Sequence, residues 1–113
     1  MVSKLLSNGF IEVNKARESG ATPLFIASQN GLEKVVAQLL IHPTIEVNKA
    51  ISNGATPLFI ASEKGHEKVV LQLLSHTSIE VNKGWKRVTP LSIASKKGYK
   101  KICVLLKGSG AFI

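Results

Sequence analysis

Three histidines, one cysteine and a lysine cluster are the residues of this sequence whose side chains could do chemistry. His42 and His76 recur at a 34-residue step, so we expect them about 8–10 Å apart, one helix-packing distance. That separation is too large for both rings to bind one metal ion, and we expect each ring to interact with a helix C-terminus instead. His66 opens a predicted helix and is assigned a structural role. Cys103 falls on a predicted buried helix face with no adjacent base, which predicts an inert core thiol.

Other signatures of catalysis are missing from the sequence. It contains no glycine-rich phosphate loop and no paired-carboxylate site. We therefore predict no enzymatic activity, and no catalytic, cofactor or metal site.

The composition is that of one globular domain. The chain has 113 residues, of which 44% are hydrophobic and 19% charged, and this balance permits a modest core. No apolar run approaches the roughly 18 residues of a membrane span, and no signal peptide precedes the first polar segment. A single cysteine cannot form an internal disulfide. These features favour an intracellular, cytoplasmic protein, with a nuclear or exported one left open.

The positive charge is concentrated at one end of the chain. All seven acidic residues lie at or before Glu80, and seven basic residues in the same segment balance them. The net charge of +8 therefore belongs to the remainder of the chain. Its basic residues are Lys83, Lys86, Arg87, Lys96, Lys97, Lys100, Lys101 and Lys107. We expect one end of the molecule to be strongly positive.

An internal repeat determines where these side chains lie. The letters GATPLFIAS occupy residues 20–28 and again 54–62, and a variant, VTPLSIAS, occupies 88–95. The steps of 34 and 33 residues predict a stacked solenoid, because a unit of this size cannot bury its apolar face alone.

Each unit contains signals for two helices. Thr22 is a predicted N-cap and Pro23 the first helical residue of a helix that extends to about Asn30. Gly31 is the left-handed terminator. A second helix, from about Glu33, is predicted to bury Val35, Val36, Leu39 and Leu40.

Three further features complete the predicted unit. Pro43 is predicted to end the second helix, and segments such as 44–49 alternate apolar and polar residues, as in an extended hairpin arm. Val2, Leu5 and Leu6 match the second helix of a unit whose first helix is absent. The finger-like turn before the first helix is one residue shorter in the last unit, and it lacks the glycine that the other units have as Gly20 and Gly54. Lys107 replaces Leu74 there, which is typical of a cap facing water.

The unit resembles an ankyrin repeat, through Thr22-Pro23-Leu24, Gly31, Val35-Val36, Leu39-Leu40 and Val47-Asn48. The resemblance implies an all-α repeat solenoid of stacked helix-turn-helix units with β-hairpin-like fingers. We expect one domain, residues 1–113, with a partial repeat at 1–20, repeats at 21–54 and 55–87, and a capping repeat at 88–113. Phe25, Phe59 and Ser92 replace the usual histidine, and we expect both phenylalanines to pack between units. A residue inserted near Pro43 predicts a local bulge.

The resemblance also implies binding of a protein through finger tips and the concave first-helix face, and the charge favours an acidic partner. The expected contacts are Glu18, Ser19, Ala21, Gln29, Asn30, Ile51, Ser52, Asn53, Ala55, Glu63, Lys64, Trp85, Lys86, Arg87, Val88, Lys96 and Lys97. Trp85 stands out as a lone tryptophan on a basic turn. At this point its ring has two interpretations: a partner contact, or a cover folded back over the turn.

The basic end leaves further alternatives open. Lys100 and Lys101 put positive charge at a positive helix N-terminus, which an anion near Gly98, Tyr99 and these lysines would relieve. A solvated cap is the plain alternative. Nucleic acid or anionic membrane could bind the same cluster, with a steep salt dependence. The chain could also be part of a longer array, and would then self-associate through Val2, Leu5 and Leu6.

Overall fold

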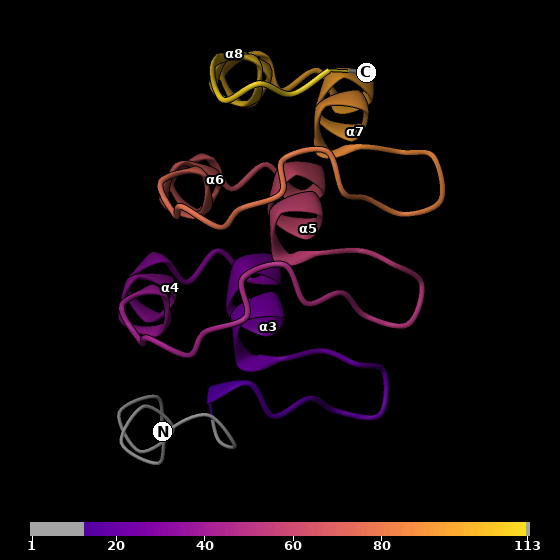
Figure 1. The fold of residues 1–113 in the computed structure, drawn as a ribbon. Coiled ribbons are helices and arrows are strands. Elements are labelled where there is room, and N and C mark those ends of the chain that lie inside the picture. Colours follow the sequence, from indigo (N-terminus) through magenta and orange to yellow (C-terminus); the bar gives the residue numbers. More distant parts are fainter. Residues whose placement is uncertain (1–12, 113) are drawn as a thin grey trace.

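The computed structural model describes residues 13–112, and the partial repeat predicted around Val2, Leu5 and Leu6 lies outside them. The described helices are α3 (Pro23–Gln29), α4 (Glu33–Leu40), α5 (Pro57–Lys64), α6 (Glu67–Leu74), α7 (Pro90–Lys97) and α8 (Lys100–Gly108). Figure 1 shows them as two columns, with α3, α5 and α7 in one and α4, α6 and α8 in the other. This arrangement is the predicted all-α solenoid of stacked helix pairs.

A threonine and a proline start the first helix of every unit. The Thr22, Thr56 and Thr89 hydroxyls accept the N–H groups of Phe25, Phe59 and Ser92 at 3.2, 3.1 and 3.1 Å. Each such cap contributes about 1 kcal/mol. The proline that follows has the φ angle of a helix and lacks only an N–H that would have no helical partner. Ser92 also accepts the Thr89 N–H at 2.8 Å, which makes a capping box in the last unit.

Glycines that follow the first helices allow a ring to pack closely. Gly31 has φ +68°, and a Cβ there would lie 2.6 Å from Nδ1 of His66. Gly65 has φ +78°, and a Cβ there would lie 2.9 Å from Cζ of Tyr99. The Nε2 atom of His66 also lies 3.0 Å from the Gln29 carbonyl oxygen. These contacts join consecutive units and confirm the structural role predicted for His66.

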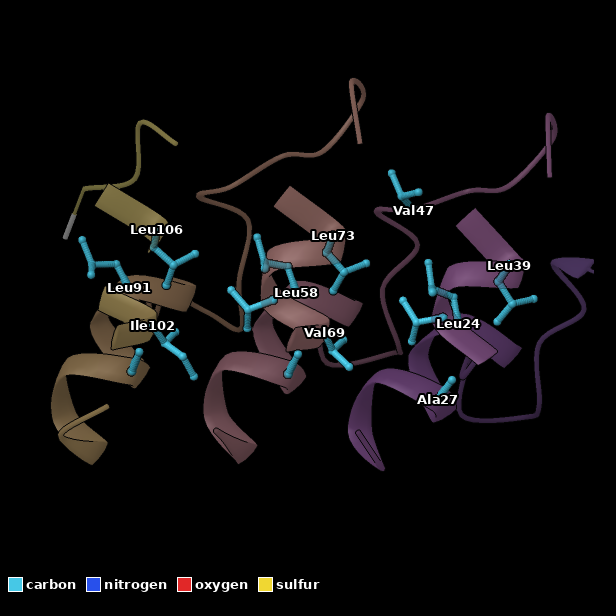
Figure 2. Close-up of a cluster of buried hydrophobic side chains, with 14 of the residues drawn as sticks. Leu24, Ala27, Leu39, Val47, Leu58, Val69, Leu73, Leu91, Ile102 and Leu106 are labelled. Carbon is cyan, nitrogen blue, oxygen red and sulfur yellow. The ribbon is translucent and has the colours of Figure 1, made fainter. Parts of the chain in front are cut away.

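The main core lies between the two columns of helices and continues through all three units (Figure 2). Leu24, Leu58 and Leu91 occupy equivalent positions and are at most 2% exposed. The fully buried leucines of the second helices are Leu39, Leu73 and Leu106. Val35, Leu40 and Leu74 are only partly buried but pack against this cluster. Because these side chains touch across unit boundaries, each unit depends on its neighbours for burial.

The predicted extended arms do not form strands within residues 13–112, where the only β-bridge joins Trp85 and Val88. Asparagine side chains hold the connections instead. Asn48 accepts the Glu80 N–H at 2.9 Å and donates to the Ser78 carbonyl at 2.7 Å. Asn14 makes the same pair of bonds to the preceding connection. The alternation prediction was wrong because side-chain amides, rather than a strand ladder, satisfy these backbone groups.

The histidines after the second helices each bond to the turn that follows. Nδ1 of His42 lies 3.3 Å from the Thr44 nitrogen, and Nδ1 of His76 lies 3.1 Å from the Ser78 nitrogen. Each ring therefore accepts from the turn that follows the helix. α4 ends at Leu40, before Pro43, but α6 ends at the equivalent Leu74 without a proline, so a proline is not required to end a second helix.

The last unit presents a more polar end than the units before it. Cys103 is half-buried, whereas the equivalent Val70 is fully buried. Cys103 packs against the main core as predicted, but its cover is only partial because no further described helix packs on α8. Lys107 is exposed as expected, Leu105 packs against the core and Phe112 is 65% exposed. Across residues 13–112, no helix has the length and apolar character needed to cross a bilayer.

Candidate protein-interaction site

The predicted contact residues lie on one side of the stack, which we call the front face. It comprises α3, α5 and α7 with three fingers, at residues 17–21, 51–55 and 85–88. Figure 1 shows the fingers projecting away from α4, α6 and α8. The exposed finger residues are Arg17, Glu18, Ser19, Ser52, Asn53, Trp85, Lys86 and Arg87, with Ile51 half-buried. Gln29, Lys96 and Lys97 are exposed at the far ends of their helices, and Glu63 is half-buried there.

The first two fingers share one geometry. In the second, the Gly54 N–H donates to the Ile51 carbonyl at 2.8 Å and the Ile51 N–H donates to the Ala55 carbonyl at 2.9 Å. Gly54 has φ +97°, so this is a three-residue hairpin loop closed by a glycine bulge. The Ser52 N–H also donates to the Ser19 carbonyl at 2.9 Å, which joins neighbouring fingers. The loops are therefore held in place before any partner binds.

The third finger is built differently because it is one residue shorter. The Val88 N–H donates to the Trp85 carbonyl at 2.9 Å, which closes a two-residue loop. Lys86 carries the positive φ, +56°, that a glycine carries in the other fingers. The indole of Trp85 is 39% exposed, and Lys86 Nζ lies 5.2 Å from the centre of its ring. Part of the ring is thus covered and part faces water.

A second apolar cluster lies beneath the fingers and fixes them to the first helices. Its buried members are Ala21, Phe25, Ala55, Phe59, Ile60 and Ile93, and Ile26, Ile51 and Val88 pack against it. The packing predicted for Phe25 and Phe59 is confirmed, since they are 4% and 3% exposed. Ala21 and Ala55 were expected as partner contacts, but they are 8% and 3% exposed and belong to this cluster. No sequence signal separated the alanines that face solvent from those beneath a finger.

The net positive charge on the front face is concentrated in the third unit, at both of its edges. At the fingers, the first has Arg17 beside Glu18, the second has no charge, and the third has Lys86 beside Arg87. At the far ends of the first helices, the corresponding pairs are Gln29-Asn30, Glu63-Lys64 and Lys96-Lys97. Within residues 13–112, Lys68 forms an ion pair with Glu33 and Lys83 forms one with Glu80. The basic residues of the third unit's front face are in neither pair.

The two groups of predicted contacts form separate edges. α7 has eight residues, which spans about 12 Å at 1.5 Å per residue. Trp85 precedes the start of α7, whereas Lys96 and Lys97 lie in its last turn. A partner that touched both groups would therefore have to span the length of α7.

The start of α8 has the features that suggested an anion site, with one difference. Gly98 has φ +78°, Lys100 and Lys101 are exposed, and α8 has no acidic residue in its first turn. Tyr99, however, is half-buried over Gly65 and packs against the core, and the Lys100 N–H donates to the Gly98 carbonyl at 3.1 Å. The Tyr99 ring and the Lys100 N–H are therefore engaged in contacts within the fold. The described part of the chain contains no group of His, Cys, Asp and Glu side chains that could hold a metal ion.

Comparison with known proteins gives matches to repeats of a single kind. A family model described as ankyrin repeats, in three copies, matches residues 41–113. A model for a single ankyrin repeat matches residues 19–50. No curated protein matches the chain.

Proposed function

The chain belongs to the ankyrin-repeat family, whose members are generally protein–protein interaction modules, and on this basis we propose that it is a non-catalytic module binding an acidic protein partner through its front face. The site consists of the third finger, the finger tips of the earlier units and the last turn of α7. The partner's acidic region lies over the third unit.

The unbalanced charge of the third unit is the observation that carries this proposal. Lys86, Arg87, Lys96 and Lys97 are exposed and belong to neither ion pair found in residues 13–112. Carboxylates on a partner would pair with them, speed association and fix the partner's direction along the stack. The neutral front edges of the first two units would contribute area without opposing the charge.

Trp85 supplies the apolar anchor of the site. Its indole is 39% exposed beside Lys86, so a partner could cover the remaining surface and remove apolar area from water. Tryptophan is enriched among residues that dominate interface energies, and truncating such an anchor typically costs about 2 kcal/mol or more. The fingers gain little order on binding because the bond from Ser52 to Ser19 and the cluster beneath them already hold them.

Affinity capture with matched variants tests the proposal. The native chain is compared with a Trp85→Ala, Lys86→Ala, Arg87→Ala variant and with a Lys15→Ala, Lys34→Ala, Lys49→Ala control, which removes three exposed cations outside the front-face site. We expect proteins that are held by the native chain and the control but lost from the finger variant. A set of partners retained equally by all three would contradict the site.

The same basic cluster is also suited to nucleic acid, and a salt titration separates this second function. Binding to backbone phosphates weakens log-linearly with salt concentration, with a slope set by the number of phosphates neutralised. Binding anchored by Trp85 should keep much of its affinity at the same salt concentrations. An oligonucleotide complex that depended on the lysines and ignored Trp85→Ala would favour the nucleic acid.

A further inference from the structure

The side of the stack opposite the front face has a regular apolar row, and we propose that this side lies on an anionic lipid bilayer. We call the outward sides of α4, α6 and α8 the back face. Ala37, Leu71 and Val104 are equivalent positions in the three second helices, and all are exposed. Leu71 is 52% exposed, Val104 69%, and Ile41, one turn after Ala37, 80%. The back face shares no residue with the front-face site, so this function is additional to the proposed one.

A row of lysines accompanies the apolar row. Lys34, Lys68 and Lys101 each lie three residues before its members, and residues three apart share one face of a helix. Figure 1 shows α4, α6 and α8 side by side, so the two rows run along the stack next to each other. These helices have five lysines against two glutamates, Glu33 and Glu67. Glu33 lies 3.6 Å from Lys68, which reduces but does not cancel the positive excess.

The shape of the apolar row favours a bilayer over a protein partner. Two shallow grooves lie between α4 and α6, one lined in part by Ala37, Leu40 and Ile41 and the other in part by Ala37, Lys68 and Leu71. Ile41 is nevertheless 80% exposed, and Val104, on α8, is 69% exposed. A protein would need a fitted hollow for each protruding side chain, whereas the boundary between lipid headgroups and acyl chains accepts them without one. The lysine ammonium groups can reach the phosphates while their methylene stems lie along the apolar layer.

Vesicle co-sedimentation tests the proposal directly. The probes are vesicles of phosphatidylcholine alone and of phosphatidylcholine with phosphatidylserine. We expect the native chain to bind the second kind at least tenfold more strongly, because each basic residue near an anionic surface is worth about a fivefold gain. Replacing the lysine row, Lys34→Gln with Lys68→Gln and Lys101→Gln, should lower binding by at least tenfold. Replacing the apolar row, Leu71→Ser with Val104→Ser, should lower it by about fivefold or more.

A matched variant separates the back face from general positive charge. Lys15→Gln with Lys49→Gln and Lys64→Gln removes the same charge from exposed positions off this face and should leave vesicle binding within about twofold. Equal loss in the two lysine variants, or no preference for phosphatidylserine, would overturn the proposal. Concentration-dependent self-association that disappears in Leu71→Ser with Val104→Ser, without vesicle binding, would assign the face to a second copy instead. The Trp85→Ala, Lys86→Ala, Arg87→Ala variant should still bind vesicles, which keeps this test independent of the front-face site.

Discussion

The Nε2 atom of His66 lies 3.0 Å from the carbonyl oxygen of Gln29, and the ring of the same histidine covers Gly31. Residues from two consecutive units thus meet where one first helix ends and the next second helix begins. A glycine leaves the space that the ring occupies.

Substitution of Gly31 should be more costly than substitution of an equivalent glycine without a neighbour. Gly31→Ala brings a Cβ to 2.6 Å from the His66 ring at φ +68°. Gly98→Ala has the same conformational penalty at φ +78° with nothing within 4 Å. We expect Gly98→Ala to lower the free energy of unfolding by about 1 kcal/mol and Gly31→Ala by about 2–3 kcal/mol, because overpacking adds to that penalty. Urea denaturation of the two variants measures the difference, and equal losses would show that the ring moves away freely.

The asparagine contacts should contribute measurably to stability. Asn48→Ala removes the bonds to the Glu80 N–H and the Ser78 carbonyl. We expect a loss of about 1–3 kcal/mol in the free energy of unfolding, since both backbone groups lose their partner. Asn30→Ala, at an exposed helix end, is the control and should cost well under 1 kcal/mol. Thermal unfolding of both variants checks this, and matching melting temperatures would contradict the role given to Asn48.

Two leucines of α6 should differ sharply although they are two residues apart. Leu73 is fully buried and Leu71 is 52% exposed. Leu73→Ala should lower the free energy of unfolding by about 2–5 kcal/mol, through lost burial and the cavity left behind. Leu71→Ala should change it by less than about 0.5 kcal/mol. Chemical denaturation gives both values, and a large loss for Leu71→Ala would mean that the folded chain covers the back face.

Backbone strain in the third finger can be relieved without removing the anchor. Lys86 has φ +56°, a region that glycine adopts freely. Lys86→Gly should therefore leave the free energy of unfolding unchanged or raise it by up to about 1 kcal/mol, and β-branched Lys86→Val should lower it by about 1 kcal/mol or more. The same denaturation assay compares the two, and a more stable Val variant would refute this account of the turn.

The sequence was most informative where one residue type has one physical role. Repeated Thr-Pro pairs predicted the starts of α3, α5 and α7, because the hydroxyl caps an amide that nothing else satisfies. Val36 and Leu39 were predicted to be buried from their spacing, and both are. These features depend on local geometry, which a repeat shows several times.

The errors arose where a side chain acts on a distant part of the chain. The alternation at 44–49 was interpreted as a strand, but Asn14 and Asn48 bind backbone about 30 residues away, and spacing does not show such a bond. Cys103 packs against the core at the predicted position but is only half-buried, since no further described helix covers it. Ala21 and Ala55 lie beneath fingers whose path depends on a glycine bulge. Of the candidate site, the sequence indicated the residues and their charge, while the gap between its two edges follows from the length of α7.

The Asn82 side chain accepts the Phe112 N–H at 3.1 Å, as Asn48 accepts the Glu80 N–H and Asn14 the Glu46 N–H. The same asparagine contact between connections thus recurs along the molecule at a constant interval. A copy of a whole unit could be inserted between two such asparagine contacts without changing how the remaining units align. Each inserted unit would then lengthen the front face and the back face by the same amount.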